Sequence, residues 1–131
     1  MADDSVFTKI IKHELPAYRV YEDELTIAFI PLHPIALAHV LVVPKLQVEA
    51  FYDLPEKDYV ALMNTVKKVA FRIREKVNSK KVGVRIEGLD VPHAHVHVLA
   101  FNNAEQFNEA IDNDAPVDNE KLANMGKLLA F

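Results

Sequence analysis

Three histidines alternate with small or apolar residues over 93–98, which reads His-Ala-His-Val-His-Val. If this segment is a β-strand, alternate side chains share a face, and the three imidazole rings stand in one row about 7 Å apart at each step. Ala94, Val96 and Val98 then point the other way, into the core. A structural strand does not need three titratable rings on one face, because burying them without partners costs free energy. The spacing therefore indicates a functional site.

Such a row has two chemical interpretations. Imidazole is the one side chain that ordinarily titrates near neutrality, so it can attack an electrophile, relay protons or bind a metal. In the first interpretation the central ring, His95, attacks phosphorus and forms a covalent intermediate, while its neighbours orient it and donate to phosphoryl oxygens. In the second, two or three of the rings ligate zinc. The spacing alone leaves both open.

Apolar periodicity and turn residues predict the elements that must position this row. They indicate an α+β domain with an antiparallel sheet of about five strands, one long helix, a short N-terminal helix and C-terminal helices. We expect helices near 6–11, from about 56 to Asn78, and more weakly over 104–111 and 119–129. We expect strands over 18–21, 25–30, 40–43, 82–86 and from His93 to about Phe101.

Composition narrows the class of protein. The 131 residues fit a single domain, 1–131, and the chain has no cysteine, which excludes disulfides, a thiol nucleophile, an iron–sulfur cluster and a cysteine-based zinc finger. The net charge of -4 argues against a nucleic-acid-binding surface. No apolar run approaches the roughly 20 residues that span a bilayer, and the acidic start does not resemble a secretory signal. We therefore expect a cytoplasmic protein with neither a membrane nor a nucleic acid as partner.

Two separated motifs resemble one known family. The segment His93–Leu99 matches the His-φ-His-φ-His-φ-φ signature of the histidine triad (HIT) family, where φ is apolar. Upstream, residues 33–45 (HPIALAHVLVVPK) resemble that family's proline-containing loop, histidine and following strand. The opening from Phe7 to Asp23 is similar to its Hint-like branch. The resemblance runs in order from about residue 6 to residue 101 and leaves 102–131 as a helical tail.

The resemblance implies an activity and an assembly. Hint-like proteins pair as homodimers with a sheet continuous across the interface, and they release nucleoside monophosphates through a nucleotidyl-histidine intermediate. Carried over, His95 is the nucleophile, and His97 and His39 orient or polarise it. His93 helps to protonate the leaving group or holds the phosphate. The substrate is then a phosphoramidate or related phosphoester of a nucleotide, with AMP the expected product and no cofactor required.

The sequence departs from the family where the substrate is expected to bind. Pro31 stands where many members have an acidic residue for the ribose, and Leu89 stands where many have a glutamine near the phosphates. We expect Leu89 and Asp90 beside the substrate and His33 at the rim of its pocket. Alternatives are cleavage of dinucleoside polyphosphates, nucleotidyl transfer, or a nucleotide- or zinc-binding module with little turnover.

Overall fold

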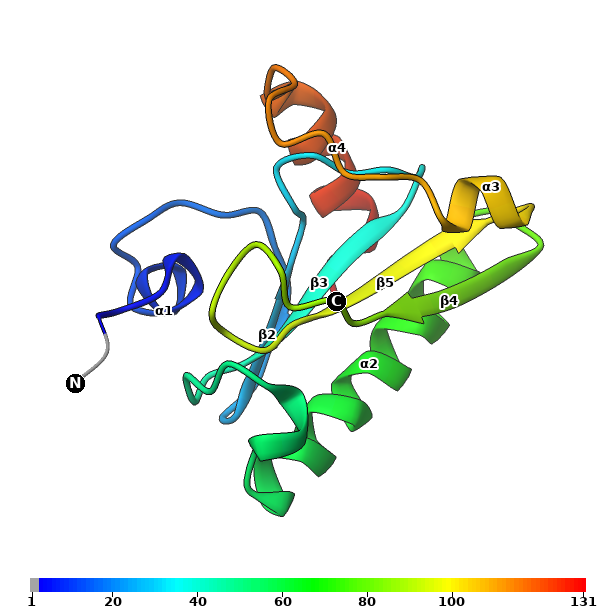
Figure 1. Ribbon diagram of the computed structural model, residues 1–131. Coiled ribbons are helices and arrows are strands. Elements are labelled where there is room, and N and C mark those ends of the chain that lie inside the picture. The colour runs from blue at the N-terminus through cyan, green and yellow to red at the C-terminus, as the bar shows by residue number, and fades with distance from the viewer. Residues whose placement is uncertain (1–2) are drawn as a thin grey trace.

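The computed structural model describes residues 3–131, and its centre is a five-stranded sheet (Figure 1). The strand order is β1-β2-β3-β5-β4, and all neighbouring strands are antiparallel. The predicted α+β class is confirmed. The strands are β1 (Arg19–Glu22), β2 (Thr26–Phe29), β3 (His39–Pro44), β4 (Lys81–Arg85) and β5 (Val96–Phe101).

One face of the sheet packs on the long helix α2 (Glu56–Lys76), which follows a short 3-10 turn at Phe51–Asp53. The apolar stripe of α2 meets side chains that alternate along β3 and β5, because every second residue of a strand points to the same face. Figure 1 shows α2 (green) packed along the sheet. This interface is the larger of the two cores, and it includes Val40, Val42, Leu62, Val66, Val69, Ile73, Val96 and Val98.

The other face carries the histidines and is only partly covered. The short helix α1 (Val6–Ile11) inserts Phe7 and Ile10 among apolar residues of β2 and β3, which forms a second, smaller core. In Figure 1 the strands separate α1 (blue) from α2. Because α1 spans six residues, it leaves room on this face for a cavity beside the histidines.

The tail closes back on the domain. A short helix α3 (Ala104–Phe107) follows β5, and α4 (Asn119–Leu129) contacts both α2 and β1. Arg72 of α2 donates to the carbonyl oxygens of Leu129 and Ala130 at 3.0 and 2.6 Å, and the Phe131 amide donates to Val20 at 2.9 Å. The segment between α3 and α4 is thereby brought to the open face. Among residues 3–131, no helix is both long enough and apolar enough to cross a membrane.

Two expectations about the strands are wrong in part. The last strand begins at Val96 and not at His93, so His93 and His95 lie in the irregular segment that precedes it. The strand near 82–86 does not bury alternate apolar residues, since Val84 and Ile86 are 42% and 37% exposed. β4 lies at the edge of the sheet, so among residues 3–131 it pairs with a strand on one side alone.

Candidate active site

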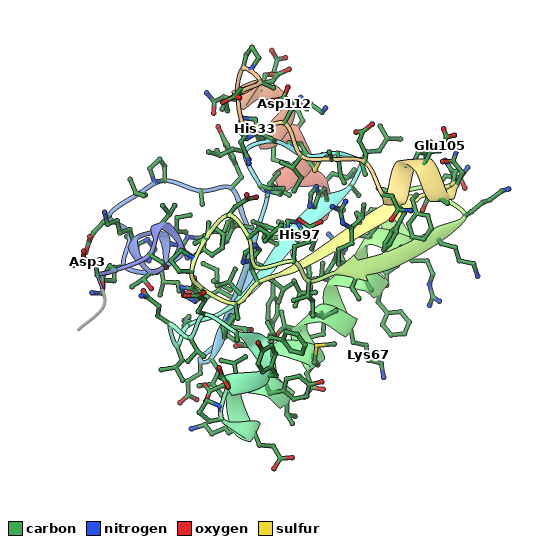
Figure 2. All side chains as sticks on the ribbon, in the orientation of Figure 1. Asp3, His33, Lys67, His97, Glu105 and Asp112 are labelled. Atoms are coloured by element: carbon green, nitrogen blue, oxygen red, sulfur yellow. The ribbon has the colours of Figure 1, made fainter. Side chains whose placement is uncertain are left out.

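Four histidines meet where β3 and β5 pair. His39 begins β3, His97 is the second residue of β5, and His93 and His95 lie just before that strand. All four side chains are at least 95% buried. Figure 2 shows His97 at the centre of the sheet. The β3–β5 register sets Leu41 opposite His97, which places His39 one pleat away on the same face.

The rings do not form the straight row that the alternation predicts. His97 is the only member of the triad within the strand, and the ring centroids of His95 and His97 lie 5.2 Å apart. The ring of His39 is also 5.2 Å from that of His97. The bend before β5 therefore packs the rings into a cluster around His97 rather than spacing them along an edge.

Hydrogen bonds from the backbone fix which nitrogen of His39 and of His97 carries a proton. The Ile35 amide donates to Nδ1 of His39 at 3.1 Å, so the proton of a neutral His39 is on Nε2. That Nε2–H donates to Nδ1 of His97 at 2.9 Å. His97 in turn carries its proton on Nε2. The pair therefore presents an N–H donor, on His97, to the open side of the cluster.

His95 has the opposite tautomer. Its Nδ1 lies 2.7 Å from the backbone oxygen of His93, and a carbonyl oxygen can only accept. Nδ1 must therefore carry the proton, and Nε2 is left with a free lone pair. The ring of Phe7 packs edge-on against that of His95, with centroids 5.0 Å apart, and limits its rotation. This is the arrangement that an imidazole nucleophile needs.

Both ring nitrogens of His93 are already used. Nε2–H donates to the Pro44 carbonyl at 2.7 Å, and Nδ1 accepts from the Ser5 hydroxyl at 2.7 Å. The side chain is fully buried and does not line the cavity. A group that protonates a leaving group, or holds a phosphate, needs a nitrogen that faces the substrate. The geometry therefore contradicts the role expected for His93 and makes it a support for its neighbours.

Burial keeps three of these histidines neutral. Burial lowers the pKa of His39 to about 3, and the nearby His97 and Arg85 act in the same direction. Burial and the neighbouring His95 lower the pKa of His97 to about 4, although Glu87 and Asp90 oppose them. Burial also lowers the pKa of His93, against the effect of its bond to Pro44. The tautomers of His39, His93 and His97 described above are thus the forms of these three rings at neutral pH.

A cavity of about 520 Å³ opens beside the cluster, a size typical of small-molecule sites. His95 and His97 lie in its wall, whereas His39 and His93 do not. Most of the remaining wall is apolar and comes from α1, β2, β3 and the loop after β2. The apolar lining includes Phe7, Ile10, Phe29, Ile30, Pro31 and Leu41.

Only some of the expected substrate-binding residues lie at the cavity. His33 and Asp90 line the cavity, but Leu89 does not, and its side chain is 84% exposed. Leu89 follows Gly88, whose φ of +70° lies in the left-handed region that favours glycine. The expectation that Leu89 contacts the substrate therefore has no support in the geometry. Arg85, the last residue of β4, forms an ion pair with Glu87, two residues beyond the strand.

The tail supplies lining residues that sequence analysis did not find. Ile111, Asn113 and Asn119 all face the cavity. His33 donates from Nε2 to the carbonyl of Ala115 at 2.9 Å, which ties the tail to the loop after β2. The two segments lie side by side in Figure 2, where His33 and Asp112 are labelled. Weak helical periodicity was the only signal in this part of the sequence, and it does not reveal a contact across 82 residues.

No cluster of three or more histidine, cysteine, aspartate or glutamate side chains is arranged to hold a metal ion within residues 3–131. Among the ring nitrogens of the four clustered histidines, those without a hydrogen bond to another group in residues 3–131 are Nε2 of His95 and Nε2 of His97. These two atoms face the cavity and are the ones that an external ligand could use.

The sequence matches the family model of the HIT domain over residues 12–104. The chain belongs to the HIT family. A curated relative from Escherichia coli K12, the purine nucleoside phosphoramidase, is 32% identical over 106 residues, which are 76% of this chain and 88% of that protein.

Solved structures of HIT proteins share the fold over nearly the whole chain. A HIT-like protein from Bartonella henselae, described as involved in cell-cycle regulation and containing an unknown ligand, has a TM-score of 0.84 and 25% identity. The match covers 98% of this chain and 96% of that one. A zinc-bound histidine triad protein from Mycobacterium smegmatis has a TM-score of 0.77 and 25% identity, with 95% and 88% covered. The similarity includes the tail.

Proposed function

We propose that the protein hydrolyses a nucleoside phosphoramidate, or a related phosphoester, and releases a nucleoside monophosphate through a covalent His95 intermediate. The observation that carries this proposal is the Nδ1–H bond from His95 to the His93 carbonyl, because it leaves the lone pair of Nε2 on the cavity side. Membership of the HIT family and the name of the E. coli relative support a nucleotide substrate.

In the first step, Nε2 of His95 attacks the α-phosphorus. The Nε2–P bond forms, the bond from phosphorus to the leaving amine breaks, and the amine takes a proton from solvent. Nε2–H of His97 lies beside the attacking ring and donates to a phosphoryl oxygen as charge accumulates there. His39 keeps that donor in place through its bond to Nδ1 of His97.

In the second step, water attacks the same phosphorus. The Nε2–P bond breaks, the nucleoside monophosphate leaves, and the proton lost by the water balances the one that the amine took up. Neither step as written requires a metal ion. The apolar wall around Phe29 and Leu41 accommodates the flat base, while Asp90 and Asn113 offer polar groups to the sugar or the leaving group.

The deciding experiment measures turnover of adenosine phosphoramidate, with a chelator present, by the wild type and by His95→Ala. Portions quenched in mid-reaction are analysed by intact mass. The matched control is His13→Asn, which changes an exposed histidine whose φ of 64° asparagine accepts readily. We expect an adenylyl adduct on the wild type and the control, and a loss of turnover of at least about a thousandfold in His95→Ala.

Other outcomes select the alternatives. Turnover only of dinucleoside polyphosphates, or transfer to an added amine or phosphate, would replace the hydrolase proposal with the related activities. Activity abolished by the chelator and restored by zinc would favour metal-dependent chemistry. Binding of AMP in calorimetry without any product or adduct would make the protein a binding module.

We propose further that two copies of the chain form a homodimer through β4. In residues 3–131 the outer edge of β4 has no neighbouring strand, and Val84 of β4 and Ile86 just after it are exposed. Unpaired edges with apolar side chains favour pairing with another strand. The Hint-like resemblance expects a sheet that continues across such an interface. A cytoplasmic location stays a prediction of the sequence.

A further inference from the structure

Three polar side chains at the start of α1 connect to the triad. Ser5, Thr8 and Gln47, together called the α1 cap below, come from two segments that are about 40 residues apart in the sequence. Ser5 and Thr8 are buried, at 6% and 9% exposure, on the open face of the sheet. Ser5 is the N-cap of α1, and its hydroxyl oxygen accepts from the Thr8 amide at 3.0 Å.

The hydrogen bonds of the α1 cap have defined directions and form a branched network. Gln47 donates to the Asp3 carbonyl at 2.9 Å, and its side-chain oxygen accepts from the Ser5 amide at 2.8 Å and the Thr8 hydroxyl at 2.6 Å. Nδ1 of His93 has no proton, because Nε2–H is bound to Pro44. The Ser5 hydroxyl must therefore donate to His93, at 2.7 Å.

This hydrogen-bond network continues through His93 to His95. The ring of His93 is held on one side by Ser5 and on the other by Pro44, and the next residue, Ala94, donates its amide to Val48 at 2.7 Å. The backbone oxygen of His93 is consequently fixed in space. That oxygen is the acceptor that orients His95 through Nδ1–H. The Ser5–His93 and His95–His93 hydrogen bonds thus join the first helix of the chain to the ring with the free lone pair, and the bonds to Pro44 and Val48 brace that connection.

We infer that the α1 cap is a positioning device for His95: it holds His93, and with it the carbonyl that aims the nucleophile at the cavity. This inference rests on the proposed function only for its kinetic consequence. Ser5, Thr8 and Gln47 do not line the cavity, so they act through His93 and not on the substrate. Near-attack geometry is sensitive to such support, since a misplacement of about 1 Å can reduce a rate by about a hundredfold.

The test compares Ser5→Ala with Ser5→Thr, which keeps a hydroxyl, and with Thr8→Val, which removes the bond to Gln47 while keeping the side chain branched. Losing an N-cap also destabilises the helix. Lys9→Gly is the matched control, because Lys9 is exposed on α1 and a glycine there costs the helix a similar amount without touching the α1 cap.

The kinetic prediction is a selective loss of kcat. We expect kcat of Ser5→Ala to fall about tenfold or more, with KM changed less than about threefold, because the substrate contacts stay intact. Thr8→Val should lose less, while Ser5→Thr and Lys9→Gly should keep wild-type kcat. Equal losses in Ser5→Ala and Lys9→Gly, or an unchanged kcat in Ser5→Ala, would overturn the inference.

A second readout needs no turnover. Long-range ¹H–¹⁵N spectra of the histidine rings report the Nδ1–H proton of His95 and the hydrogen-bonded Nδ1 of His93. In Ser5→Ala we expect the His93 nitrogen to move toward the resonance of a free imine nitrogen and the His95 proton to exchange faster with water. Unaltered signals would refute the positioning role. If the wild type is inactive, the proposed function fails, and these spectra still decide about the α1 cap.

Discussion

His39 donates a hydrogen bond from Nε2 to Nδ1 of His97 at 2.9 Å, and both rings are buried on the face of the sheet opposite α2. The Ile35 amide fixes the direction of this bond by donating to the other nitrogen of His39 at 3.1 Å. A backbone N–H thus determines, through two rings, that His97 presents a proton to the cavity. The finding gives His39 a role although it does not touch the substrate site.

Removing this relay should impair the chemical step. We expect His39→Ala to lower kcat about tenfold to a hundredfold with little change in KM, since the donor on His97 serves the transition state. His39→Gln should retain more activity, because an amide N–H can also donate to Nδ1 of His97. Steady-state kinetics of the two variants check this. Identical losses would mean that the ring fills space and does not orient His97.

The depressed pKa values predict how stability depends on pH. An unfolded histidine titrates near pH 6.5, whereas the folded chain lowers the pKa of His97 to about 4 and that of His39 to about 3. At pH values between the unfolded pKa and the lower folded pKa of each ring, the unfolded chain binds more protons than the folded chain. Acid therefore favours unfolding. The stabilisation is complete above about pH 6.5. It is lost as the pH falls, at no more than about 1.4 kcal/mol per pH unit and per group.

Urea denaturation at pH 7, 6, 5 and 4 measures this loss. We expect the free energy of unfolding to fall throughout the series, and to fall less steeply in His39→Gln, which lacks one of the titrating rings. The His13→Asn variant is the control, because His13 is exposed and outside the cluster. A slope in His39→Gln equal to that of the wild type would show that His39 does not resist protonation in the folded state.

Local sequence patterns predicted most of the helices and strands. The predictions that are wrong concern places where segments distant in the sequence meet. The alternation over 93–98 is that of a strand, yet the pairing with β3 ends at Val42 and Val96. Beyond that point the Ala94 amide bonds to Val48, in the loop after β3. Periodicity reports which face a residue occupies, and Ala94, Val96 and Val98 do point into the core as predicted. It does not report where a partner strand stops.

The same limit explains the unexpected parts of the site. Ser5 is the N-cap of α1, which is a local role, but its bond to His93 spans 88 residues and has no local signature. The role expected for His93 failed for the same reason, since the groups that occupy its nitrogens are remote in sequence. His95 could be singled out from the motif, whereas the supports around it required the structure.

His33 gives a test of the tail as part of the binding site. Its Nε2–H bond to Ala115 holds the segment with Asn113 against the cavity. We expect His33→Ala to raise KM about fivefold with kcat nearly unchanged, the effect of losing a hydrogen bond worth about 1 kcal/mol. His33→Gln, which keeps a donor, should be close to wild type. Leu89→Ala should change neither constant, because Leu89 does not line the cavity.

Measurements of kcat and KM for the three variants on one substrate decide this prediction. A raised KM in Leu89→Ala would restore that residue to the site and imply that the turn at Gly88 rearranges when substrate binds. A wild-type KM in His33→Ala would mean that the tail does not contribute to binding.

The exposed edge strand leads to a prediction about assembly. Val84 lies on β4, where its side chain is 42% exposed. If two copies pair through this edge, Val84→Lys brings two like charges into one interface, and like charges across paired strands are destabilising. We expect the wild type to scatter light as a dimer at micromolar concentration and Val84→Lys to shift toward the monomer, with Kd raised about tenfold or more.

The control is Val117→Lys, the same substitution at a position of similar exposure in the tail, 40%. Because Val117 is remote from β4 in the sequence and outside the sheet, this variant should remain dimeric. A wild type that is monomeric at every concentration would remove the homodimer proposal. If both lysine variants dissociate equally, the added charge itself weakens the dimer, and the result gives no support for an interface at β4.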